Sequence, residues 1–485
     1  MASEPRNKNI ELGEAAILRE DYVDALAFFE AAAEEGCAQA LTFLSSMYED
    51  GLGVAHDPET VLSLLHQAAS VGDAEACGRL GYLHAVGKFV EQNLGAAVEY
   101  HKIAAKQGLA NSQCDLGHHY ARGIGVEQDF SKAEQWYTLA AEAGHLGAQC
   151  GLAEILFSLA NPNRDPAEAV KWTEAAAASG DVKSQYITGV MKLGSVHPEL
   201  EDFRGAQHWL ATAARNGSTD AMFQIGNCFE HGIGTEQDYE AAAFNYFHAS
   251  QTGHVEATFA LGTLYEHGLG VEQNFENARD LYRAAARKFH PSALFNLGRL
   301  YQFGWGVTAD YAEAHKHYLL AAERGHLMCQ FLVGQALLRG VEGTKVDVEE
   351  GASWMMRAAE SGFAEAQAQL GFCYLLGQGV EQDHEAALHW SLAAAEQGHA
   401  WAQYRAAHIL IRHGPRREAE FVEAVKWLVR SFNQPQEEGE RRHEIIKDDF
   451  NFLQSALPAD VFEAACSEAA ASKGYVPATS QGGHA

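Results

Sequence analysis

The feature that most constrains this chain is a short pattern that returns every 36 or 37 residues. The pattern is Ala-Ala-x-x-Gly or a close variant, and once Phe289 stands in the glycine position. Such a fixed period is typical of repeat proteins, in which each unit contacts mainly its neighbours. The glycines are Gly36, Gly72, Gly108, Gly144, Gly180, Gly217, Gly253, Gly325, Gly362 and Gly398.

Each repeat has the same chemistry at the same places, counted forward from its glycine. Place four is small, place nine is often glycine and place twelve is often aromatic, while a Trp or Tyr stands eight residues before the next glycine. Places four, five, eight, nine and twelve share one face of a helix, so we expect a first helix, helix A, to pack on a second, helix B. A GxGV loop should end helix A. An aspartate should then cap helix B: Asp57, Asp129, Asp165, Asp238, Asp310 or Asp383.

One helix pair cannot bury its own apolar face, so neighbouring pairs must stack. The fold class is therefore predicted to be all-α, a right-handed α-solenoid of about twelve helix-turn-helix repeats. The predicted organisation is a disordered start (1–8), an incomplete repeat (9–36), eleven repeats (37–434), capping helices (435–473) and a flexible tail (474–485).

The pattern resembles the Sel1-like repeat family, a relative of the tetratricopeptide repeat. The resemblance rests on the small residues at places four and nine, the GxGV loop and the EQD or EQN that follows it. It covers about residues 9–434 and implies an all-α superhelix that acts as an adaptor or scaffold. The loops at 156–165, 192–202 and 339–347 depart from the pattern, so no family loop contact is carried over to them.

The charge of the chain indicates the chemistry of its partners. Lys and Arg number 35 against 65 Asp and Glu, a formal net charge of −30. Such a surface repels phosphate backbones and anionic lipids, so we expect basic proteins or peptides as partners and no nucleic acid. No apolar run is long enough for a membrane span, so no membrane insertion is expected. The sequence leaves the oligomeric state open.

The cysteines and the first residues indicate a cytoplasmic protein. No two of the eight cysteines are close in sequence and none forms CxxC, which argues against a disulfide framework and against a zinc site. The polar segment 1–11 is not a secretory signal.

A search for catalytic motifs finds none. S-x-x-K, G-x-S-x-G and H-E-x-x-H are all absent. Five histidines directly follow the landmark position, about 10 Å apart along the stack, too far to share a metal ion. We expect them to start helices, and we expect no metal and no cofactor. They are His145, His254, His290, His326 and His399.

Places three, six, ten and thirteen of helix A face away from helix B, toward the predicted concave surface. Place six is aromatic in consecutive repeats, which predicts an aromatic ladder for a partner: Tyr186, Phe223, Phe259, Phe295 and Phe331. The alternative is that these rings sit at the edge of the buried face and wedge between neighbouring A helices.

Two further sets of candidate binding residues lie on the same face. An apolar groove in the last repeats should take a helix or an extended peptide, unless the C-terminal helices fold back and fill it. Its residues are Met328, Leu338, Phe372, Leu375, Trp401, Tyr404 and Ile411. An acidic stretch should favour a basic segment, or else be a solvated face: Asp220, Glu230, Glu256 and Glu266.

Trp305, in a GWG loop, is a candidate binding hot spot, with packing on a neighbouring loop as the alternative. Together these features predict a non-enzymatic scaffold that binds protein partners in its groove. The alternatives are a hydrolase-like enzyme with an unrecognised groove site, and an organelle assembly factor.

Overall fold

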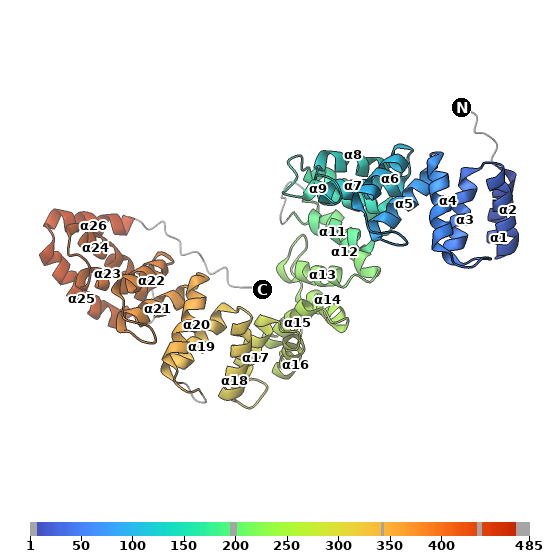
Figure 1. The fold of residues 1–485 in the computed structure, drawn as a ribbon. Helices are drawn as coiled ribbons and strands as arrows, with labels where there is room; N and C mark the ends of the chain where they lie inside the picture. The colour runs from blue at the N-terminus through green and yellow to red at the C-terminus, as the bar shows by residue number, and fades with distance from the viewer. Residues whose placement is uncertain (1–6, 195–200, 341–343, 434–438, 472–485) are drawn as a thin grey trace. The chain divides into compact units, whose positions relative to one another are not determined.

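The computed structural model describes residues 7–194, 201–340, 344–433 and 439–471, and the residues described are helices joined by short loops, without a strand. The chain divides into two compact units, Met1–Gln237 and Asp238–Ala485. In each unit the helices follow one another in chain order (Figure 1).

Unit 1 consists of six helix pairs and the first helix of a seventh, and odd-numbered helices are the A helices. Its helices are α1 (Lys8–Ile17), α2 (Tyr22–Glu34), α3 (Ala38–Asp50), α4 (Pro58–Ser70), α5 (Ala74–Val86), α6 (Leu94–Lys106), α7 (Ala110–Arg122), α8 (Phe130–Glu142), α9 (Leu146–Phe157), α10 (Pro166–Ala178), α11 (Val182–Lys192), α12 (Phe203–Arg215) and α13 (Thr219–His231).

Unit 2 continues the alternation and adds two helices after the last repeat. Its helices are α14 (Tyr239–Gln251), α15 (Val255–His267), α16 (Phe275–Ala286), α17 (Pro291–Phe303), α18 (Tyr311–Glu323), α19 (Leu327–Arg339), α20 (Val348–Glu360), α21 (Ala364–Leu376), α22 (His384–Glu396), α23 (Ala400–Arg412), α24 (Glu418–Phe432), α25 (Gly439–Ala456) and α26 (Ala459–Ala471).

The helices begin and end at the residues that the repeat pattern predicts. Each of the six predicted aspartates accepts a hydrogen bond from a backbone N–H in the first turn of a B helix. The five histidines cap A helices in the same way through Nδ1, as His326 does for the N–H of Cys329 at 3.2 Å. The landmark glycines have positive φ, and Phe289 adopts φ 60° in their place.

Within a repeat, the missing side chain at place nine lets a ring of helix B lie directly on helix A. A Cβ on Gly117 would lie 2.7 Å from the ring of Tyr137, and Gly298 faces Tyr318 in the same way. In these two repeats the buried ring stands seven residues before the next landmark, whereas the pattern predicted the eighth, where Trp136 is half-buried. Trp354, eight residues before Gly362, is buried as predicted.

Between repeats, a glutamine at place five ends the preceding B helix. The Nε2 of Gln330 donates to the carbonyl of Ala322 at 3.2 Å, and five other buried glutamines make the same bond. These bonds satisfy carbonyls that a helix end leaves without a partner. The five are Gln113, Gln149, Gln185, Gln367 and Gln403.

The two ends of the chain differ in part from the predicted organisation. The opening repeat has both helices, α1 and α2, and Asn7 caps α1, so order begins inside the segment predicted to be disordered. At the other end, α25 and α26 pack on α24 through Ile446, Leu453 and Phe462. Residues 1–6 and the tail 474–485 lie outside the described ranges, and the right-handed course of the solenoid stays a prediction.

Candidate functional site

The phenylalanines at place six of unit 2 contact the repeat that follows each of them. In unit 2, the ring of Phe259 stacks on His290 with ring centroids 4.6 Å apart, and Phe295 stacks on His326 at 4.9 Å. Phe331 packs edge-on against Phe363 at 5.8 Å. All three phenylalanine rings are half-buried. Each partner is the residue that begins the following A helix, so these rings close the seam between successive A helices.

The place-six rings of unit 1 are half-buried as well. Tyr186 packs against the apolar core that contains Leu210, and burial raises the pKa of its hydroxyl, with a smaller contribution from Asp220. Phe223 has a comparable exposure. The alternative of rings wedged between A helices therefore describes Phe259, Phe295 and Phe331, and recognition of a partner by the exposed edges of the place-six rings stays a prediction.

The expectation that Leu338 and Ile411 line an open groove is wrong, because both side chains are buried. Leu338 packs with Met355 and Leu370 between helices of successive repeats. Ile411 belongs to the core formed with the C-terminal helices. Place thirteen points into the stack at these two positions.

The other residues of the predicted apolar groove keep part of their surface. Tyr404 packs on the core around the C-terminal helices, and Phe372 lies under the guanidinium of Arg405, 4.8 Å from its ring centroid. Met328 is exposed, and Leu375 and Trp401 are half-buried. The C-terminal helices thus cover the end of this face, at Tyr404 and Ile411.

The acidic residues fall into two kinds. Glu266 is buried, accepts a 2.6 Å hydrogen bond from the hydroxyl of Tyr282 and lies 3.3 Å from Arg299, so its expected place on an open acidic surface is wrong. Asp220 and Glu256 are exposed and Glu230 is half-buried. Asp220 and Glu230 belong to unit 1 and Glu256 to unit 2.

Trp305 is half-buried among residues of its own and the preceding repeat. Its ring stacks on Phe303 with centroids 4.9 Å apart and lies 5.8 Å from Phe275, which begins the preceding B helix. The guanidinium of Arg299 lies 5.4 Å from the ring centroid. Packing on a neighbouring repeat therefore describes this side chain, and its role as a hot spot stays a prediction.

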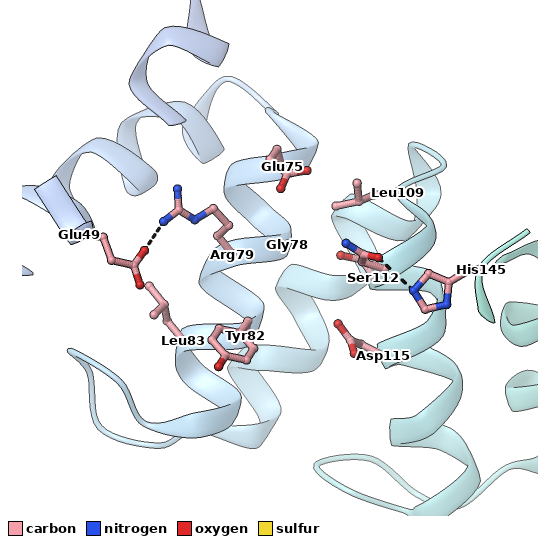
Figure 2. Close-up of a pocket in the computed structure, with 11 residues that line it drawn as sticks. Glu49, Glu75, Gly78, Arg79, Tyr82, Leu83, Leu109, Ser112, Asp115 and His145 are labelled. Atoms are coloured by element: carbon pink, nitrogen blue, oxygen red, sulfur yellow. Dashed lines mark hydrogen bonds and ion pairs between the residues drawn. The ribbon is translucent and has the colours of Figure 1, made fainter. Parts of the chain in front are cut away.

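A pocket that the sequence reasoning missed lies on the A-helix face of the first repeats. Its volume is about 320 Å³, and its lining comes from α3, α5 and α7 and from the residues that begin α7 and α9 (Figure 2). We call it the Gly78 pocket. It is lined by Glu49, Glu75, Gly78, Arg79, Tyr82, Leu83, Leu109, Asn111, Ser112, Asp115 and His145.

The sequence carries a signal for this pocket at place six. Gly78 occupies place six, which holds a ring in several later repeats, so no ring lies between α5 and α7 at this place. Leu109, which begins α7, lies so near that a Cβ on Gly78 would be 2.7 Å from its Cδ2. The side chains of Leu109 and Ser112 therefore approach Gly78 closely, and a Cβ on Gly78 would lie only 2.9 Å from Oγ of Ser112.

One wall of the pocket is a network of ion pairs that uses the donors of Arg79. Its guanidinium pairs with Glu49 and donates to Ser45, Ser46 and the carbonyl of Thr42, all on α3. Burial would raise the pKa of Glu49, but the ion pairs with Lys88 and Arg79 outweigh it and lower that pKa. The positive charge of Arg79 is thus directed toward α3.

The opposite wall carries Asp115 and His145. Asp115 Oδ2 lies 3.7 Å from Nδ1 of His101, and burial lowers the pKa of this imidazole although Asp115 opposes the change. His101 is therefore neutral near pH 7 and leaves the charge of Asp115 uncompensated. His145 accepts the N–H of Ala148 at Nδ1, so its proton is on Nε2, which donates to Oδ1 of Asn111 at 3.0 Å.

The remaining pocket groups are an exposed carboxylate and an exposed ring. In the portion of the chain that the structure describes, Glu75 has no ion-pair partner, and Tyr82 projects its ring between the two walls (Figure 2). The pocket can therefore offer carboxylate oxygens and an aromatic face to a ligand. Such groups bind a cation and do not constitute a nucleophile with its base.

The described residues hold neither a cluster of metal ligands nor a helix fit to cross a membrane. No group of three or more His, Cys, Asp or Glu side chains among them could hold a metal ion. In the same ranges, no helix has the length and apolar character that a membrane crossing needs. All eight cysteines are free thiols.

Two-helix repeats that stack in chain order define a helical-repeat protein. Comparison with known proteins gives its family. The Sel1 repeat matches eleven segments, and the chain belongs to the Sel1 repeat family. The matched segments are 11–37, 38–73, 74–109, 110–145, 147–181, 182–218, 219–250, 255–288, 291–326, 327–363 and 364–399. The first match, 11–37, covers most of the opening pair of helices, α1 and α2. The last match ends at residue 399, before α23 and α24.

Solved structures agree with this assignment. The chain is similar to c5321, a protective antigen present in uropathogenic Escherichia coli strains displaying an SLR fold, with 28% identity, a TM-score of 0.60 and coverage of 93% of this chain and 97% of that one. A Sel1 repeat protein from Oxalobacter formigenes is 28% identical, with a TM-score of 0.44, over 52% of this chain and 98% of that one. No curated protein matches the chain.

The family gives the general class of function. Sel1-repeat proteins generally mediate protein–protein interactions, and the repeat fold is typically a non-catalytic scaffold.

Proposed function

We propose that this protein is a scaffold that holds a basic protein partner on the A-helix face of its repeats. The observation that carries the proposal is the Gly78 pocket, to which three successive A helices contribute. Such a pocket exists only when repeats stack, so it is a property of the solenoid and not of a single helix pair.

The charge of the chain supports a basic partner. The formal net charge is −30, and exposed carboxylates such as Glu75, Asp220 and Glu256 lie on A helices. An acidic surface accelerates the encounter with a basic partner and disfavours nucleic acid. The part of the apolar face that stays open, around Met328 and Phe372, adds contact area for a helix or an extended segment.

Site-specific photo-crosslinking in a native lysate tests the proposal. A benzophenone amino acid replaces Tyr82 or Met328 on A helices, and Leu139 or Leu320 on B helices. The pairs are matched within each unit, because Tyr82 is 56% and Leu139 48% exposed, while Met328 is 37% and Leu320 40% exposed. We expect the A-helix positions to crosslink a basic protein and the B-helix positions not to.

Equal crosslinking from both helix faces would contradict the proposal, as would a partner reached only from B helices. An acidic protein captured from the A-helix positions would retain the scaffold and overturn the charge preference.

A further inference from the structure

We propose that the Gly78 pocket binds one arginine side chain of the partner protein, which deepens the proposed function by naming the group that the A-helix face recognises. The guanidinium would lie between the carboxylates of Glu75 and Asp115, with the ring of Tyr82 along its plane.

The size of the pocket fits a single side chain. Its volume of about 320 Å³ is at the small end for a ligand site. An extended peptide that crosses the A helices could place one long side chain there, while its backbone stays outside.

The charges of the pocket favour a cation over an anion. Arg79 is the one basic side chain other than His145 in the lining, and its guanidinium donates to Thr42, Ser45, Ser46 and Glu49 of α3. An anionic group would therefore meet Glu75 and Asp115 without a free guanidinium to balance them. A cation would meet the carboxylates of Glu75 and Asp115. Among the described residues, no Lys or Arg forms an ion pair with either of them.

The shape of the available groups favours arginine over lysine. A guanidinium is flat, is weakly hydrated and stacks on aromatic rings while it donates to carboxylates in its plane. Tyr82 supplies the exposed ring, and Glu75 and Asp115 supply acceptors on two different helices, α5 and α7. Leu109 offers an apolar surface for the stem of the side chain.

Binding of a small probe to the full chain tests this inference without knowledge of the partner. The probe is acetyl-Gly-Arg-Gly-amide, and acetyl-Gly-citrulline-Gly-amide is its uncharged match. Methyl NMR of Leu83 and Leu109, which line the pocket, reports binding. We expect a dissociation constant on the order of 1 mM for the arginine peptide, because exposed ion pairs stabilise weakly, and at least about fivefold weaker binding of the citrulline peptide.

Charge variants with a matched control separate the pocket from the general acidity of the surface. Glu75→Gln with Asp115→Asn should weaken the arginine peptide about fivefold or more. Glu59→Gln with Glu91→Gln removes the same charge from exposed positions of unit 1 outside the pocket and should leave the affinity unchanged. Circular dichroism checks that both variants fold.

Equal binding of the two peptides by the wild-type chain would overturn the inference, as would undiminished binding by the pocket variant. A lysine peptide that binds more tightly than the arginine peptide would also overturn it. These results would leave the crosslinking experiment standing, so a failed pocket and a failed scaffold give different outcomes.

Discussion

The hydroxyl of Tyr282 donates a 2.6 Å hydrogen bond to the carboxylate of Glu266, and both side chains are buried between the two helices of one repeat. Burial, followed by the charge of Glu266, raises the pKa of the Tyr282 hydroxyl, so it stays protonated and able to donate. Arg299 of the next repeat lies 3.3 Å from the same carboxylate. A buried anion therefore joins helix A to helix B and one repeat to the next.

We expect Tyr282→Phe to lower the free energy of unfolding by roughly 1–3 kcal/mol, because a buried carboxylate loses a donor. Urea unfolding followed by circular dichroism measures the change. Tyr318→Phe is the matched control, since Tyr318 holds the same place in the next repeat but donates to Gln302, a neutral acceptor. An equal loss in both variants would show that the charge of Glu266 adds nothing.

The fold follows from the sequence because its determinants are local. Asp310 and His326 cap helices within three residues of themselves, and the landmark glycines end helices by their own φ, so a fixed spacing reveals them. In one repeat the pattern predicts a buried ring at Trp136, but the neighbouring Tyr137 is buried instead. One residue turns a helix by about 100°, so a ring at the edge of the buried face is only half-buried.

The site was harder to predict because it depends on which side chains meet across helices. Glu256 and Glu266 both stand on the predicted open face, but the hydroxyl of Tyr282 and the guanidinium of Arg299 enclose only Glu266. The pocket had one signal in the sequence, Gly78 at a place that is aromatic in several later repeats. Its meaning becomes clear only after rings such as Phe295 are seen to close the seams.

The half-buried histidine that caps α19 makes stability depend on pH. Nδ1 of His326 accepts the N–H of Cys329, and burial lowers the pKa of this imidazole. The unfolded chain then binds the proton more readily than the folded chain does. The stability is fully present above the unfolded pKa, about 6.5, and is lost as the pH falls below it.

We expect His326→Asn, which keeps a capping acceptor but does not titrate, to flatten the fall in stability between about pH 7 and pH 5. Urea midpoints at several pH values measure the slope. His267→Asn is the control, because His267 is an exposed histidine of the same unit, at the end of α15. An unchanged slope for His326→Asn would assign the acid sensitivity to other groups.

The last repeat is fastened to the C-terminal helices by Asp449. Its buried carboxylate on α25 lies 2.8 Å from Nδ1 of His408 and 3.3 Å from Arg412, both on α23. Asp449→Asn should weaken the docking of α25 and α26 by about 1–2 kcal/mol, because charged hydrogen bonds contribute more than neutral ones. Hydrogen exchange should become faster in 445–471 and stay unchanged in α14 to α18. Asp448→Asn, an exposed neighbour, should have no such effect.

The glutamine of the EQD loop gives the last prediction. Nε2 of Gln128 donates to the carbonyl of Ala121 at 2.8 Å, while the next residue, Asp129, caps the following helix, so two adjacent side chains end one helix and begin another. Four more repeats make the same bond between a loop glutamine and the carbonyl seven residues before it: Gln92, Gln237, Gln273 and Gln382.

We expect Gln128→Ala to cost about 0.5–1.5 kcal/mol, and Gln128→Glu to cost as much because a carboxylate cannot donate to a carbonyl. Glu127→Ala, an exposed neighbour in the same loop, should be nearly neutral. Hydrogen exchange of the amides at 121–126, with urea unfolding for the global change, distinguishes a frayed end of α7 from a general loss of stability. If these amides were as protected in Gln128→Glu as in the wild type, the helix would end because a side chain of this size packs in the loop, and not because of the donated hydrogen bond.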